Sequence, residues 1–311
     1  MTMTATRRVT IAAIVGVGVA FAAGYGVSRL ALKPRPKPFE PPPISAIDSS
    51  PFGRQVAFGR AIFDNPQTYA HNFVGADLKC SNCHLGEGRV ANSAPMWGAY
   101  VAYPQYRAKN GHVNTFAERL QGCFRYSENG KAPPLGDPVL VALESYAYFL
   151  AKGAPTGVKI AGAGYPKLAK PPLQPDYARG QDVYGANCAM CHGFDGHGQS
   201  ARGRLVFPPV WGPSSYNWGA GMAQINNAAG VIKANMPLGK GGSLTDQQAW
   251  DVALFIDSQP RPQDPRFTGD IAETRKKYHD DADSMYGKVA NGVLLGQGAP
   301  TATGAPGTAN H

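Results

Sequence analysis

Apolar residues in this chain form one continuous run and two shorter stretches with helical spacing. The run covers residues 9–27 and follows Arg7 and Arg8. Residues 138–153 and 245–260 carry apolar side chains three and four positions apart, and each stretch ends near glycine or proline. This spacing predicts amphipathic helices, and no long stretch alternates between apolar and polar residues as a strand does. We therefore expect a mostly α-helical protein.

The continuous apolar run predicts export. Its 19 residues are just enough to span a bilayer, so we expect residues 1–32 to form a membrane anchor. A cleaved signal peptide is the alternative, with Ala20 to Ala22 as a cleavage site. The run continues past that site, which favours the anchor. Residues 33–50 are rich in proline and predict an extended spacer that holds the body on the periplasmic side of the inner membrane.

The rest of the chain repeats itself. In "GRAIF" and "GQDVY" a glycine lies four residues before an aromatic residue, and each stretch precedes a pair of cysteines. One of the two amphipathic helices follows each pair, so two copies of one helical module explain the pattern. We expect domains over residues 51–153 and 177–262, joined by a Gly/Pro-rich linker over 154–176. Residues 263–311 are expected to be a partly disordered tail, with low complexity from residue 296.

Both cysteine pairs have the spacing C-x-x-C-H, the attachment signature of c-type haem. The two thiols form thioethers with the haem, and the adjacent histidine becomes the proximal iron ligand. A zinc site needs four converging ligands, but the pairs are 108 residues apart and lie in separate repeats. A redox dithiol would need a βαβ context that the pattern lacks. The sequence therefore predicts two tandem class-I-like cytochrome c domains with two covalently bound haem c groups, held by Cys80, Cys83, His84, Cys188, Cys191 and His192.

The sixth iron ligand of the second module is expected to be Met236. It lies in "ANMPLG", in a loop before the last predicted helix, where small cytochromes c commonly present an axial methionine. A methionine in the core is the alternative interpretation. Lys233 and Lys240 are close in sequence, so replacement of Met236 by a lysine in some redox state stays open.

Cys123 takes the corresponding place in the first module. It follows His84 by 39 residues, and Met236 follows His192 by 44 residues. The sequence therefore predicts that Cys123 is the second ligand of the first haem, with a buried thiol or an intermolecular disulfide as alternatives. A thiolate ligand lowers a haem potential and a His/Met pair raises it, so electrons would pass from the first haem to the second.

The charge distribution favours a small anionic substrate. The net charge is +9, yet no run of basic residues interleaved with aromatic residues appears, so a nucleic acid partner is not expected. Four basic residues cluster around Cys123 in the sequence, and guanidinium groups hold oxyanions with two hydrogen bonds. These residues are Arg107, Arg119, Arg125 and Lys131.

The stretch "RLQGCFRYSENGK" resembles the thiosulfate dehydrogenases (tetrathionate synthases), which are distant relatives of the Cys-ligated haem subunit of the sulfur-oxidising multienzyme complex. The resemblance covers residues 52–260 and implies that two thiosulfates are joined as tetrathionate at the Cys-ligated haem. It implies a catalytic site made by Cys123, Arg107, Arg119, Ser127, Asn129 and Lys131. This chain departs from the family pattern at Tyr126, where the family has an arginine directly before the serine.

These observations leave three functions to compare. The first is the oxidation of a small anionic sulfur substrate, with electrons passing to an acceptor cytochrome or an oxidase. The second is a membrane-tethered dihaem cytochrome that only relays electrons and would not need Cys123. A dihaem peroxidase is third, since the sequence supplies neither an open iron position nor a general base.

Overall fold

The computed structural model describes residues 37–202 and 204–299. The predicted membrane anchor and the beginning of the spacer lie outside the described residues. Across the part of the chain that is described, no helix is long and apolar enough to cross a membrane.

The described part of the proline-rich spacer packs on the first domain. It contains one 3₁₀ turn, η1 (Ile44–Ala46). The guanidinium group of Arg89 donates hydrogen bonds to the backbone carbonyls of Pro41 (3.1 Å) and Pro42 (2.6 Å). The ring of Phe39 lies 5.6 Å from that of Trp97. Residues 37–50, which the composition predicted to be an extended spacer, therefore contact the domain that follows them.

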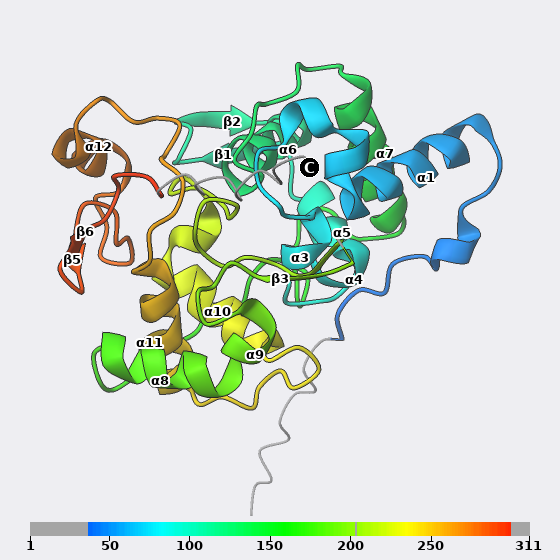
Figure 1. Cartoon of the computed structure of the whole chain (residues 1–311). Helices are drawn as coiled ribbons and strands as arrows, with labels where there is room; N and C mark the ends of the chain where they lie inside the picture. Colours follow the sequence, from blue (N-terminus) through cyan, green and yellow to red (C-terminus); the bar gives the residue numbers. More distant parts are fainter. Residues whose placement is uncertain (1–36, 203, 300–311) are drawn as a thin grey trace, which may run out of the picture. The chain divides into compact units, whose positions relative to one another are not determined.

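The first domain is built on two helices that lie side by side, α1 (Pro51–Asp64) and α7 (Pro138–Leu150) (Figure 1). A Cβ at Gly59 would overlap the backbone carbonyl of Ala142, so glycine allows this close approach. Phe63, four residues on, is buried beside the ring of Tyr146. The glycine–aromatic spacing seen in the sequence is thus a helix-packing device.

Short elements between these helices position the first cysteine pair and Cys123. The helix α6 begins with a capping box between Thr115 and Glu118, and it ends at a π-helical turn that begins with Cys123. Strands β1 and β2 form an antiparallel hairpin before α6. In chain order these elements are α2 (Pro66–Tyr69), η2 (His71–Phe73), α3 (Cys80–Cys83), α4 (Leu85–Gly88), α5 (Met96–Tyr100), β1 (Gln105–Arg107), β2 (His112–Asn114), α6 (Phe116–Gly122) and η3 (Cys123–Ser127).

The second domain repeats this plan. Helices α8 and α11 lie side by side (Figure 1), and Gly180 allows close approach to the backbone carbonyl of Asp251. Tyr184 is buried, and its hydroxyl donates to the carbonyl of Gly193 at 2.7 Å. The elements are α8 (Tyr177–Asn187), α9 (Ala189–His192), β3 (Gln199–Ala201), β4 (Arg204–Phe207), η4 (Gly221–Ala223), α10 (Ile225–Asn235) and α11 (Asp246–Asp257).

Both helices predicted from apolar spacing are confirmed, as α7 and α11. Thr245 is the N-cap of α11, and its side chain accepts a hydrogen bond from the backbone N–H of Gln248. Strands in the described residues occur only as three two-stranded hairpins, in agreement with the expected mostly α-helical class.

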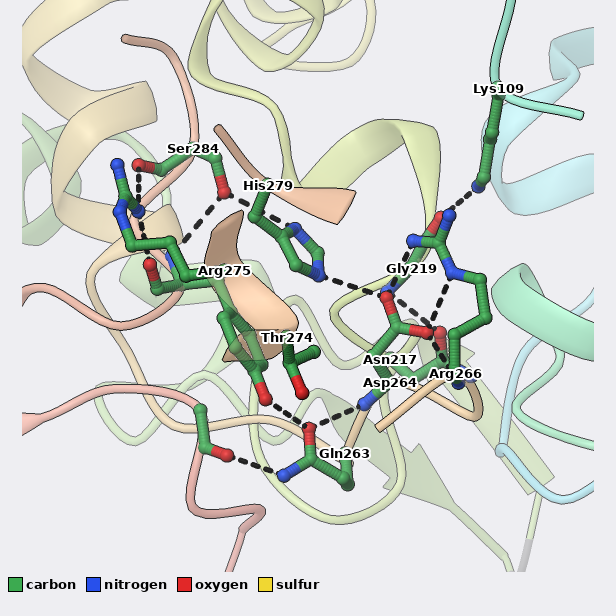
Figure 2. A network of polar contacts seen from close by, with 12 residues as sticks. Lys109, Asn217, Gly219, Gln263, Asp264, Arg266, Thr274, Arg275, His279 and Ser284 are labelled. Atoms are coloured by element: carbon green, nitrogen blue, oxygen red, sulfur yellow. Dashed lines mark hydrogen bonds and ion pairs between the residues drawn. The ribbon is translucent and has the colours of Figure 1, made fainter. Parts of the chain in front are cut away.

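The segment after α11 is folded, although the sequence indicated a tail. It contains α12 (Ile271–Tyr278), β5 (Val289–Ala290) and β6 (Val293–Leu294). Asp264 and His279 are buried within it, and Asp264 accepts hydrogen bonds from Arg266 (2.6 Å) and from Nε2 of His279 (2.9 Å) (Figure 2). Tyr286 and Leu295 join the core of the second domain. The stretch predicted to be disordered begins at residue 296, and most of it lies outside the described residues.

The ion pairs of Asp264 are expected to stabilise this segment in a pH-dependent way. Burial raises the pKa of Asp264, but the hydrogen bonds from His279 and Arg266 outweigh it and hold the pKa well below its usual range. A carboxylate whose pKa is lower in the folded than in the unfolded protein stabilises the fold at pH values above its unfolded pKa. This contribution is lost progressively as the pH falls below about 4 towards the folded pKa. Asp264→Asn should cost about 3–5 kcal/mol at pH 7 and somewhat less at pH 3, where the unfolded carboxyl is largely protonated but the folded one is still ionised. Thermal unfolding at both pH values tests this, with Asp280→Asn, an exposed site, as the control.

Hydrogen bonds connect the two haem-binding modules. The side-chain N–H groups of Asn217 donate to the carbonyl of Arg125 (2.9 Å) and to Oδ1 of Asn129 (3.0 Å). The backbone N–H of Asp77 donates to the carbonyl of Ser214 at 2.9 Å. Ala76 and Leu78 from the first module are buried in the core of the second. The turn that carries Cys123 is therefore fixed against the second module.

Candidate functional site

The first C-x-x-C-H motif lines a buried pocket that also contains Cys123. Nδ1 of His84 lies 2.7 Å from the carbonyl of Ala94. Because a carbonyl only accepts hydrogen bonds, Nδ1 carries the proton and the lone pair of Nε2 stays available. The two cysteines of α3 and the side chain of Met96 line the same pocket.

The thiol of Cys123 lies beside a cation that favours its ionised form. Nη1 of Arg119 donates to Sγ of Cys123 at 3.0 Å, and the two residues are one helical turn apart. Burial raises the pKa of Cys123, but the positive charge of Arg119 opposes this and favours a lower pKa. The same pocket raises the pKa of Cys83 to about 12, because burial dominates there and Glu128 and Cys123 add repulsion. Cys123 is therefore the thiol whose ionised form this pocket favours most.

The second C-x-x-C-H motif lines a larger cavity of about 270 Å³; the free volume of the first is about 70 Å³. Nδ1 of His192 lies 2.8 Å from the carbonyl of Pro208, which again leaves Nε2 as the free nitrogen. Burial lowers the pKa of His192, which favours the neutral ring that binds metals. Met236 follows α10 and lines this cavity. Nζ of Lys233 is held by the carbonyl of Leu244 at 2.6 Å and by Asp246 at 3.1 Å.

The cysteine, histidine and methionine side chains that line the two pockets suit covalently attached haem. Each pocket combines two cysteines and a histidine with a free Nε2. The first also contains the sulfur atoms of Cys123, Met96 and Met222, and the second those of Met222 and Met236. In addition, Nε and Nη1 of Arg261 are buried without a partner among the described residues. Its guanidinium group lies 4.5 Å from the ring centre of Tyr216, which lines the second cavity. A buried cation with free donors suits the carboxylates that haem carries.

The two pockets share a wall. Leu78, Cys83 and Met222 line both of them. Groups bound in the two pockets would therefore have these three side chains as common neighbours.

A third, open pocket of about 410 Å³ adjoins the first. Arg119, Ser127 and Gly221 line both, so the open pocket lies next to the site of Cys123. Its lining carries five cationic residues and one acidic residue, Glu118. The cationic residues are Arg107, Lys109, Arg119, Arg266 and Lys277. Sequence reasoning did not identify Lys109, Arg266 and Lys277, and for the last two the reason is that their segment was interpreted as a tail.

The residues named from the sequence take different places around these pockets. Arg107 lines the open pocket, and its Nη1 donates to the hydroxyl of Tyr103 at 2.8 Å. Asn129 and Lys131 are not among the described residues that line either pocket. Asn129 has a left-handed backbone (φ 46°) and accepts from Asn217, while the backbone N–H of Lys131 donates to the carbonyl of Phe73 at 3.0 Å. Substrate contact by these two residues stays a prediction.

Comparison with protein families assigns a class to each module. Residues 67–156 match the family described as "SoxA/TsdA, cytochrome c domain". Residues 175–256 match "Cytochrome C oxidase, cbb3-type, subunit III". The chain is therefore a cytochrome with two c-type domains and two covalent haem c groups, as the repeat and the C-x-x-C-H motifs predicted.

Individual relatives narrow the class to a family. The chain is 58% identical to a thiosulfate dehydrogenase of Thiomonas intermedia (strain K12), with 84% of each chain covered. It is 52% identical to a thiosulfate dehydrogenase of Stutzerimonas stutzeri (strain A1501), over 84% of this chain and 85% of that one. Among solved structures, thiosulfate dehydrogenase (TsdBA) from Marichromatium purpuratum in its "as isolated" form matches with a TM-score of 0.82 and 46% identity. That match covers 85% of this chain and 59% of the other. The chain belongs to the thiosulfate dehydrogenase family, which confirms the resemblance seen in the sequence.

Proposed function

We propose that the chain oxidises two thiosulfate ions to one tetrathionate ion, with loss of two electrons, at the pocket that contains Cys123. The observation that carries this proposal is the 3.0 Å hydrogen bond from Arg119 to Sγ of Cys123, because Arg119 also lines the adjoining cationic pocket. The family relationship supports the same reaction.

Each proposed haem site is one of the two pockets lined by a C-x-x-C-H motif. Cys80 and Cys83 attach the first haem within domain 51–153, with His84 and Cys123 as iron ligands. The second haem, within domain 177–262, is attached and ligated by Cys188, Cys191, His192 and Met236. Each haem iron supplies a one-electron acceptor, so the two together take the electron pair of the reaction.

Arg107, Arg119 and Ser127 are the proposed substrate-binding residues, because they line the open pocket next to the site of Cys123. Two dianions held about 4 Å apart repel each other by about 4 kcal/mol even in water. Guanidinium groups offset this repulsion and hold sulfonate oxygens through paired hydrogen bonds.

Cys123 is the proposed reacting group. Its thiolate sulfur bonds to the outer sulfur of one thiosulfate, and two electrons leave: RS⁻ + S₂O₃²⁻ gives RS–S–SO₃⁻ and 2 e⁻. The terminal sulfur of a second thiosulfate then attacks the sulfur that is bonded to Sγ of Cys123. The bond to Cys123 breaks, tetrathionate (S₄O₆²⁻) forms and the thiolate is restored. Arg119 stabilises the thiolate as the leaving group.

Turnover by the purified protein tests this function. With ferricyanide as the acceptor, we expect one tetrathionate for every two thiosulfates consumed and every two ferricyanides reduced. An electron relay without substrate chemistry predicts no thiosulfate consumption across a range of pH values. Such a result, in protein that carries both haems, would refute the proposal in favour of the relay.

Met236 is proposed to set the higher potential of the second haem, so that electrons move from the first site to the second and on to an acceptor cytochrome or oxidase. Met236→His should lower that potential by on the order of 0.1 V, a fraction of the ~0.8 V range that axial ligands control. Spectroelectrochemical titration checks this shift, with Met190→Leu, at an exposed methionine, as the control. An unchanged potential in the His variant would exclude Met236 as a ligand.

Residues 9–27 are proposed to hold the protein at the periplasmic face of the inner membrane, and cleavage near Ala22 is the alternative. N-terminal sequencing of the protein from membrane and periplasmic fractions distinguishes the two. An intact N-terminus in the membrane fraction supports the anchor, and a soluble protein that begins after Ala22 contradicts it.

A further inference from the structure

The open pocket is built from parts of the chain that are far apart in the sequence. The hairpin turn after β1 contributes Lys109, the chain before η4 contributes Gly219, and the folded C-terminal segment contributes Arg266. This segment lies beyond both cytochrome c family matches, which end at residues 156 and 256. The part of the outer wall that carries Arg266 is thus an addition to the two haem-binding modules.

The ring of Tyr126 organises the cations of this outer wall. Nζ of Lys109 lies 3.6 Å from the ring centre, and the guanidinium carbon of Arg266 lies 5.2 Å from it. The ring attracts both cations, which holds two like charges in one place. A Cβ at Gly219 would overlap the Tyr126 ring, so the glycine is needed for this arrangement.

Hydrogen bonds fix the same cations further. The ammonium group of Lys109 donates to the carbonyl of Gly219. Nε and Nη2 of Arg266 donate to the two carboxylate oxygens of Asp264, at 3.0 and 2.6 Å (Figure 2). Nε2 of His279 forms a hydrogen bond with the same carboxylate. Arg266 is therefore held rigidly by its own counter-ion. Lys109 has no carboxylate within salt-bridge distance among the described residues.

We propose that the open pocket is a second anion site, in which Lys109 and Arg266 bind the outer sulfonate of the second thiosulfate and of the tetrathionate product. The inference rests on the proposed function, because tetrathionate carries a sulfonate at each end. One end lies at Arg119 and Ser127, which line both pockets, and the other end reaches the cations on Tyr126.

The electrostatics of Lys109 agree with this assignment. Much of its side chain is exposed, but the ammonium group is enclosed between Tyr126 and Gly219. Burial, followed by repulsion from Arg266, lowers the pKa of Lys109 to about 7. Asp264 opposes this shift, and Arg119 and Arg107 add to it. An anion next to Lys109 would supply the missing negative charge and restore its proton.

Equilibrium binding of tetrathionate to the oxidised dihaem protein tests the second site. Lys109→Gln removes the charge and keeps a donor for Gly219, and it should weaken tetrathionate binding by roughly 10-fold to 100-fold. Lys109→Arg keeps the cation and should retain most of the affinity. Lys276→Gln, at an exposed neighbour that does not line the pocket, is the matched control and should bind as the unmodified protein does.

Calorimetry in buffers of different ionisation enthalpy gives a second readout. At pH 8 the unmodified protein should take up protons as tetrathionate binds, and Lys109→Gln should take up fewer. Equal affinity and equal proton uptake in the Gln and control variants would overturn the second site, while normal thiosulfate turnover would leave the proposed function standing. If turnover is absent but Lys109→Gln still weakens tetrathionate binding, the anion site stands without that function.

Discussion

Replacing Cys123 with glycine should reduce thiosulfate oxidation by at least about 10³-fold while both haems stay attached. The thiolate is the proposed reacting group, and Cys123 is the thiol whose ionised form its pocket favours most. The C-x-x-C-H residues that attach the haems are unchanged in this variant, so haem content should match that of the unmodified protein. Ferricyanide-coupled turnover and a haem assay measure the two quantities.

A second variant separates the reaction from the ligation of iron. Cys123→Met keeps a sulfur ligand of the kind found in the second pocket, but a thioether is not a thiolate nucleophile. We expect this variant to be as inactive as the glycine variant, with a raised potential of the first haem. More than a tenth of the original activity in either variant, at full haem content, would contradict the role of Cys123.

Replacing Arg119 with glutamine should lower kcat/KM for thiosulfate by about 10²–10³-fold. Arg119 donates to Sγ of Cys123 and also lines the open pocket, where the dianion is proposed to bind, so one substitution removes two proposed favourable interactions. Without Arg119, the free-energy cost of burying the Cys123 thiolate is no longer offset by the adjacent guanidinium charge. The thiolate is then a poorer leaving group. Steady-state kinetics with thiosulfate check the loss.

The conservative variant refines this prediction. Arg119→Lys keeps the charge but not the planar fork of donors, so it should recover only part of the lost rate. Arg54→Gln changes the same charge at an exposed position away from the pockets and should leave the kinetics unchanged. An Arg119→Gln variant within a factor of three of the unmodified protein would show that Arg119 is not part of the site.

Much of the fold could be predicted because it is encoded locally. The apolar spacing of α7 and α11 and the glycines at positions 59 and 180 are helix signals that act within a few residues. The count from each proximal histidine placed Cys123 and Met236 at equivalent positions, and each lines the pocket of its own module. Repetition made this possible, because one copy is a template for the other.

The outer wall of the site could not be predicted in this way. Lys109, Gly219 and Arg266 meet around Tyr126 only after three distant segments have folded together. The segment after residue 262 is rich in charged residues, which indicated a tail. In the structure its charges pair inside the protein, as Asp264 does, and hydrophobic residues such as Leu295 complete the core. Composition alone does not show which charges are paired.

The most direct test of the account is the mass of the peptide that contains Cys123 after the oxidised protein has reacted with one equivalent of thiosulfate. The account predicts that this peptide gains one S₂O₃ unit, and that a further thiosulfate removes the unit and releases tetrathionate. If tetrathionate forms while Cys123 stays unmodified at every stage of the reaction, the proposed role of Cys123 as the reacting group is wrong.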